Sequence, residues 1–144
     1  TVFSDSRIIV NFPISTAIYI YDLQGHLQKQ FSPIEDFKKT EPIETQERSA
    51  RAFLEHLNSN PFLYPIQPFK DGEFYLQFGR DAVPEDKENT IFGYNFIYDK
   101  DFETVNILKM NKILFSMGGS YLYHQLVLER PDSQYLERYE LSIE

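Results

Sequence analysis

The chain has 144 residues, of which 42% are hydrophobic and 16% aromatic, and its formal net charge is −8 at pH 7. This length and hydrophobic content suit one folded domain with its own core, and the negative charge argues against a nucleic-acid partner, because phosphates would be repelled. The lack of cysteine excludes disulfides and thiolate metal sites but leaves the compartment open, and no apolar run reaches the roughly 18 to 20 residues that cross a bilayer.

The first clear elements are a β-hairpin and a helix. Residues 18–31, IYIYDLQGHLQKQF, contain two alternating runs around an Asp- and Gly-containing turn, which predicts the hairpin. A short inserted helix is predicted near residues 45–58, with Thr45 as its N-cap and Asn60-Pro61 as its end. Apolar side chains recur there at helical spacing, at Ala50, Phe53, Leu54 and Leu57.

Further strands are predicted after the helix. Four alternating runs, with KDG and DKD as turns, are expected at residues 62–66, 73–79, 91–98 and 103–109. Two more runs, at residues 112–116 and 120–129, flank a Gly-Gly turn, and LERYELSI at residues 136–143 predicts a final strand. The chain is therefore expected to be rich in antiparallel strands.

A Tyr-acid pair recurs where strands are predicted to end. Tyr21 and Tyr98 each precede an Asp and lie 77 residues apart, and Tyr139, with an acidic neighbour, follows 41 residues after Tyr98. Such recurrence is typical of repeated β units, including propeller blades that repeat about every 40 to 50 residues. We therefore predict an all-β fold of antiparallel four-stranded blades, with strands A to D counted outward from the propeller axis.

The predicted strands form a single segment, residues 1–144, of about two and a half blades. The first unit would begin at strand B with residues 7–12, RIIVNF, and the last would end at strand C. Because propellers have about 4 to 8 blades, we expect the C-terminal part of a larger ring. Its exposed strand edges would pair with missing N-terminal blades or with a second copy of the chain.

The order of the motifs carries a family resemblance. FPISTAIYIYDLQG, the helix, FLYPIQPFKDGEFYLQFGR, FIYDKDFETVNIL and the closing GSYLYHQLVLE together resemble the C-terminal half of bacterial proteins grouped as the domain of unknown function 4221 family. The resemblance implies a six-bladed propeller and an exported lipoprotein, periplasmic or at the cell surface, while a cytoplasmic location stays open. It implies no reaction and no catalytic residues.

No catalytic, metal or cofactor site is predicted. Ser120 in MGGSYL lacks the second Gly of the G-x-S-x-G nucleophile elbow, so a hairpin turn explains it better. The three histidines, His26, His56 and His124, are isolated and match no metal-binding spacing. DKDFE lacks the Gly and the distal Glu of a calcium loop, so a polar turn is the better interpretation.

Candidate ligand-binding residues follow from strand direction. In alternating strands the B–C and D–A connections share one face, which here receives the long segments 32–61, 80–90 and 130–134, and binding usually develops on such loops. The candidates are two arginines that each follow a strand B and the acids beside them: Arg80, Arg130, Asp81 and Asp132. The alternative is that these arginines pair with local acids, Asp81, Glu85 or Asp132.

Two functions are consistent with this pattern. The first is a non-catalytic binding or interaction module with a glycan or protein ligand on the long-loop face, because strand packing explains the conspicuous features. The second is a glycan-processing hydrolase or lyase whose active site is completed by missing N-terminal blades.

Overall fold

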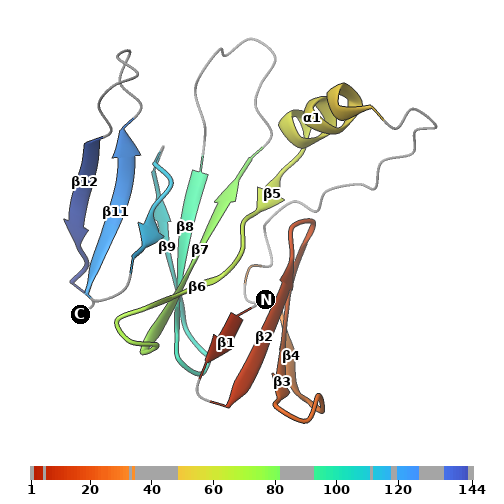
Figure 1. Ribbon diagram of the computed structural model, residues 1–144, viewed down its shortest axis with the longest axis vertical. Coiled ribbons are helices and arrows are strands. Elements are labelled where there is room, and N and C mark those ends of the chain that lie inside the picture. The colour runs from red at the N-terminus through yellow and green to blue at the C-terminus, as the bar shows by residue number, and fades with distance from the viewer. Residues whose placement is uncertain are drawn as a thin grey trace.

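The computed structural model describes residues 2–4, 6–32, 34, 49–81, 93–110, 112–117, 120–126 and 135–142. Within these residues the chain forms three antiparallel sheets and one helix (Figure 1). The prediction of an antiparallel all-β chain with one helix is therefore confirmed.

The first sheet has the strand order β1-β2-β3-β4. Its strands are β1 (Val2–Ser4), β2 (Arg7–Phe12), β3 (Ser15–Asp22) and β4 (Leu27–Phe31). The prediction that this unit begins at its second strand is wrong, because Val2 to Ser4 pair with Ile9 to Arg7 and cover that edge. A strand of three residues is too short to give a periodic signal.

The central sheet has the order β5-β7-β8-β9, with β6 also pairing with β7. Its strands are β5 (Phe62–Leu63), β6 (Gln67–Phe69), β7 (Phe74–Arg80), β8 (Gly93–Asp99) and β9 (Val105–Lys109). The strand predicted at 62–66 is thus shorter than expected, and β6 begins only after its predicted end. Pro65 lies between β5 and β6, and a proline cannot donate a ladder hydrogen bond.

The third sheet has the order β10-β11-β12. It contains β10 (Phe115–Ser116), β11 (Tyr121–Leu126) and β12 (Tyr135–Glu140). The strand β6 of the central sheet contacts both β1 and β10, so it lies between the early strands of the other two sheets.

Two hydrophobic cores lie on opposite faces of the central sheet. Neighbouring side chains of a strand point to opposite faces, so Tyr75 and Tyr98 enter the core shared with the first sheet, and Leu76 and Ile97 enter the core shared with the third. The central sheet is therefore buried on both sides.

Two asparagine side chains join neighbouring sheets in the same way. Asn11 of β2 donates to the Tyr64 carbonyl (3.2 Å) and accepts from the Ile66 amide (3.4 Å), just before β6. Asn95 of β8 donates to the Lys112 carbonyl (3.0 Å). It also accepts from the Leu114 amide (3.2 Å), just before β10. Each amide thus satisfies a carbonyl and an N–H two residues apart, which keeps these backbone groups from being buried unpaired.

The two Tyr-Asp repeats end strands with the same turn. The Asp22 carboxylate accepts from the amides of Gln24 (3.0 Å) and His26 (2.8 Å). The Asp99 carboxylate accepts from the corresponding amides, of Asp101 (3.0 Å) and Glu103 (2.9 Å), and from a third, that of Thr104 (2.8 Å). This confirms the polar-turn interpretation of DKDFE.

The residue three positions after each aspartate has a left-handed backbone. It is Gly25 in the first turn (φ 86°) and Phe102 in the second (φ 57°). Glycine adopts this conformation without strain, whereas for other residues it costs roughly 1–2 kcal/mol. Phe102 is almost fully buried, so its packing offsets that cost.

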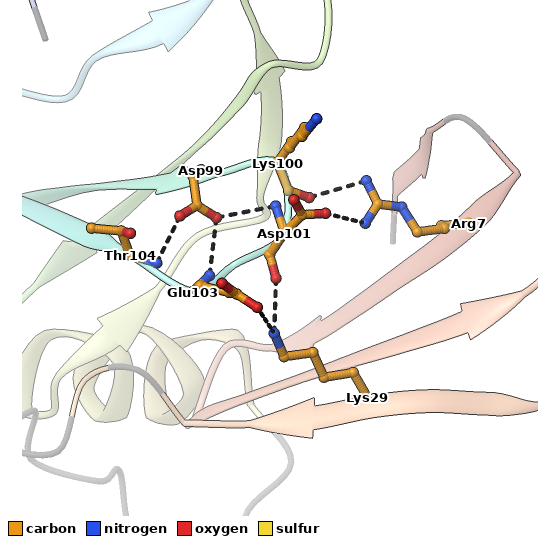
Figure 2. Close-up of polar contacts among 7 residues, drawn as sticks. All are labelled: Arg7, Lys29, Asp99, Lys100, Asp101, Glu103 and Thr104. Atoms are coloured by element: carbon orange, nitrogen blue, oxygen red, sulfur yellow. Dashed lines mark hydrogen bonds and ion pairs between the residues drawn. The ribbon is translucent and has the colours of Figure 1, made fainter.

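Charged side chains of the first sheet hold the second of these turns (Figure 2). Arg7 donates to the Lys100 carbonyl (3.0 Å) and lies 3.6 Å from the Asp101 carboxylate. Lys29 donates to the Asp101 carbonyl (2.9 Å) and lies 3.9 Å from the Glu103 carboxylate. Exposed ion pairs of this kind add little stability, but together with the two hydrogen bonds they connect the first sheet with the turn after β8.

The Asp99 turn gives the protein a pH-dependent stability. Partial burial raises the pKa of Asp99, but its hydrogen bonds from Glu103, Thr104 and Asp101 outweigh burial and hold the pKa below the ordinary value of 3.8. A carboxylate with a lowered folded-state pKa stabilises the fold above its unfolded value, and that contribution is lost as the pH falls through the folded pKa.

We therefore expect Asp99→Asn to lower the free energy of unfolding by about 1 to 2 kcal/mol at neutral pH. The difference in the free energy of unfolding between this variant and the wild type should shrink below pH 3.8. Urea denaturation of both proteins at neutral pH and below pH 3.8 would measure it. Asp71→Asn, at an exposed turn position, is the control. A deficit independent of pH would contradict the role of the ionised carboxylate.

Two tyrosines that face each other across β7 and β8 differ in one hydrogen bond. Tyr75 and Tyr98 are paired in register and fully buried. The Tyr98 hydroxyl donates to Gln77 Oε1 (2.7 Å), whereas that of Tyr75 has no hydrogen-bond partner among the described residues. Burying an unpaired hydroxyl is unfavourable, and so is removing the donor of a buried acceptor.

Tyr75→Phe is therefore expected to raise the free energy of unfolding by about 1 kcal/mol, and Tyr98→Phe to lower it by a similar amount. Both substitutions remove one oxygen from a buried ring, so each serves as the control for the other. Equal changes of the same sign in thermal or urea unfolding would be inconsistent with this hydrogen-bond assignment.

Candidate functional site

The two ends of the strands carry different kinds of connection in the central sheet (Figure 1). At one end lie the tight turns after β3 and β8 and the turn at Lys70–Glu73, which Gly72 closes with a hydrogen bond to the Phe69 carbonyl (3.2 Å). At the other end lie the helix, the paired ends of β7 and β8 at Arg80 and Gly93, and the paired ends of β11 and β12 at Leu126 and Tyr135. We call this the long-connection end, because the strand ends that meet there are the farthest apart in the sequence. A rigid scaffold that carries long connections on one side is a usual setting for binding.

Helix α1 (Ala50–Ser59) stands at the long-connection end. Its N-cap is Ser49, whose hydroxyl accepts from the Ala52 amide (3.1 Å), so the predicted start near Thr45 is wrong, and Thr45 itself lies outside the described residues. Both residue types cap helices well. The predicted end at Asn60 is confirmed, and the Asn60 amide group donates to the His56 carbonyl (2.9 Å).

Arg80 fixes the last turn of this helix to the central sheet. Its guanidinium is largely buried, with the residue only 8% exposed, and it donates to the Leu57 carbonyl. Carbonyls of the last helical turn have no partner within the helix, and a cation there also interacts favourably with the helix dipole. Arg80 thus positions α1, and the partner that the described residues give it is a backbone carbonyl. Glu85, one of the acids considered as its partner, lies outside the described residues.

Asp81 lies beside Arg80 but bonds to a different group. The Tyr94 hydroxyl donates to the Asp81 carboxylate (2.9 Å), which joins the end of β7 to the start of β8. This hydrogen bond is the largest cause of the raised pKa of Tyr94, with burial adding to it. The other two predicted site residues, Arg130 and Asp132, lie outside the described residues, so a ligand-binding role for the four stays a prediction.

A second polar group, missed by the sequence reasoning, lies between the central and third sheets. The Lys112 ammonium donates to Glu137 Oε2 (2.6 Å) and to the Tyr139 hydroxyl (2.5 Å), and that hydroxyl donates to Glu137 Oε2 (2.6 Å). We call these three residues the Lys112 cluster. The alternation of Glu137 and Tyr139 along β12 could have indicated a shared face, but no local pattern connects them with Lys112.

Lys112 and Glu137 of the Lys112 cluster are both charged at neutral pH. The hydrogen bond from Lys112 lowers the pKa of Glu137, and the bond from Tyr139 adds to this effect. The hydrogen bond to Glu137 raises the pKa of Lys112, with a further contribution from Tyr139. The cluster therefore offers fixed opposite charges whose sum is zero.

Metal and membrane features are not found in the described part of the chain. Within the described ranges, no group of three or more His, Asp or Glu residues is placed to hold a metal ion. Among the residues whose structure is described, no helix is long and apolar enough to cross a membrane.

Comparison with known proteins gives a similarity of fold. No family model matches the sequence, and no curated protein matches it significantly. The chain is similar in structure to a crystal structure of a member of the DUF4221 family from Bacteroides vulgatus, with a TM-score of 0.63 and 16% identity over 94% of this chain and 43% of that one. This likeness is one of fold, to a member of the family that the motifs resemble, and the chain spans less than half of that protein.

Proposed function

We propose that the chain is part of a β-propeller, six-bladed in its complete form, that acts as a non-catalytic binding or interaction module. The observation that carries the proposal is the difference between the two ends of the sheets. Tight turns join the strands of the central sheet at one end, and α1 lies at the other together with the paired ends of β7 and β8 and of β11 and β12. Such an end is suited to contact a glycan or protein ligand.

Two features favour the propeller arrangement. The early strands β1, β6 and β10 of the three sheets lie together, as the innermost strands of blades do around an axis. The asparagine bridges of Asn11 and Asn95 join successive sheets with the same geometry, as expected of repeated units. In this proposal the missing blades cover the outer faces of the first and third sheets.

A ligand screen tests the binding role. The protein would be melted in the presence of oligosaccharides, divalent metal salts and candidate protein partners, and every ligand that raises the melting temperature would be tested for turnover. Binding raises stability in proportion to the logarithm of ligand excess over Kd. We expect a bound glycan or protein without turnover. Product formation would instead favour a glycan-processing hydrolase or lyase.

An exported location at the periplasm or cell surface is part of the proposal, as in the lipoproteins that the motifs resemble. Fractionation of the source cells with an antibody to this chain would test it. A purely cytoplasmic signal would contradict it.

A further inference from the structure

The hydrogen bonds inside the Lys112 cluster leave part of its bonding capacity unused. The Lys112 ammonium has three N–H groups, of which two are engaged by Glu137 and Tyr139. Both bonds to Glu137 end on Oε2, so Oε1 takes no part in the cluster. The side chains of Lys112 and Glu137 are 38% and 39% exposed, so a ligand can reach the remaining donor and acceptor.

A histidine adds a second acceptor beside Glu137. His124 of β11 is paired in register with Glu137, and its Nδ1 lies 3.1 Å from the Ile113 carbonyl. A carbonyl only accepts, so Nδ1 carries the proton, and in the neutral form of the ring Nε2 is an acceptor. One donor, the third N–H of Lys112, and two acceptors, Glu137 Oε1 and His124 Nε2, therefore lie on this part of the third sheet.

An exposed aromatic ring lies on the same side of the strand. Tyr135, Glu137 and Tyr139 alternate along β12 and so share one face of the sheet. Tyr135 is 52% exposed and is the first residue of β12. Its ring offers a flat apolar surface next to the polar groups.

Neutral sugars present these two features together. Their hydroxyls both donate and accept hydrogen bonds, and one face of the ring carries C–H groups that pack on an aromatic side chain. The ion pair of the Lys112 cluster has no net charge, which provides no excess of attraction for an acidic or a basic ligand. We infer that the Lys112 cluster, His124 and Tyr135 form a binding site for a neutral carbohydrate, an inference that rests on the proposed binding role.

The test is an array of neutral and acidic oligosaccharides, followed by calorimetry with the best neutral binder. Tyr135→Ala and Glu137→Gln are each expected to weaken binding about tenfold, which corresponds to roughly 1.4 kcal/mol. Glu103→Gln removes an exposed acid at the opposite end of the sheets and should leave the affinity unchanged within about twofold. Melting curves of all variants would verify that they are folded.

The outcomes separate this inference from the proposed function. A wild-type protein that binds a protein partner or only acidic sugars keeps the binding role and overturns the neutral-sugar site. Neutral-sugar binding that survives both Tyr135→Ala and Glu137→Gln also overturns this site. If Glu137→Gln does not fold, Tyr135→Ala decides, because its side chain is exposed.

Discussion

Phe102→Ala is expected to lower the free energy of unfolding by about 4 kcal/mol, since truncation of a buried Phe costs roughly 3–5 kcal/mol. The Phe102 ring stacks on Tyr75 (4.7 Å between centroids) and contacts Tyr98 (5.4 Å) in the central sheet. It also makes an edge contact with Phe31 of the first sheet (5.5 Å). The substitution would therefore open a cavity between two sheets.

Urea denaturation would measure this effect, with Phe53→Ala as the matched control. Phe53 lies on helix α1 and is 53% exposed, so the same substitution there should change stability by no more than about 0.5 kcal/mol. Similar losses in the two variants would show that Phe102 is not the buried contact between the first and central sheets.

Asn95→Ala is expected to destabilise the protein by about 3 kcal/mol. Asn95 is fully buried, and its removal leaves the Lys112 carbonyl and the Leu114 amide without their partner. Each buried polar group left unsatisfied costs roughly 1–3 kcal/mol. Because Lys112 begins the segment that leads to β10, we also expect local loosening of the third sheet.

Asn106→Ala is the control for this prediction, since Asn106 is exposed on β9 of the same sheet. Hydrogen exchange should show faster exchange of Leu114 and the third sheet in Asn95→Ala, with the first sheet unchanged. Unchanged exchange at Leu114 would contradict a bridge between the two sheets.

Alternation and turn chemistry allowed most strands to be predicted. β3 alternates between buried and half-buried residues and ends at the Asp22 turn, whereas β7 and β8 are long apolar and aromatic runs bounded by the turns at Gly72 and Asp99, so hydrophobic pattern and turn signal agree. The missed β1 has three residues, too few for a period. The strand predicted at 62–66 is shorter in the structure, where β5 and β6 pair with β7 on either side of Pro65. The sequence shows the proline but not how its segment pairs with β7, so this interruption was missed.

The candidate site was less predictable, because its contacts join distant parts of the chain. Sequence reasoning found Arg80 but could not foresee its bond to Leu57, which depends on where α1 docks. Lys112 and Glu137 meet only after β10, β11 and β12 are paired. Side chains whose neighbours come from other strands carry no local signal of their partners.

Ligand mapping by hydrogen exchange tests the central claim most directly. The neutral oligosaccharide that binds best in the array would be added to the protein, and protection of backbone amides would be compared with and without it. We expect protection at the long-connection end, around Arg80, Tyr94, Lys112 and Glu137. Protection confined to the tight turns at Asp22, Gly72 and Asp99 would contradict it.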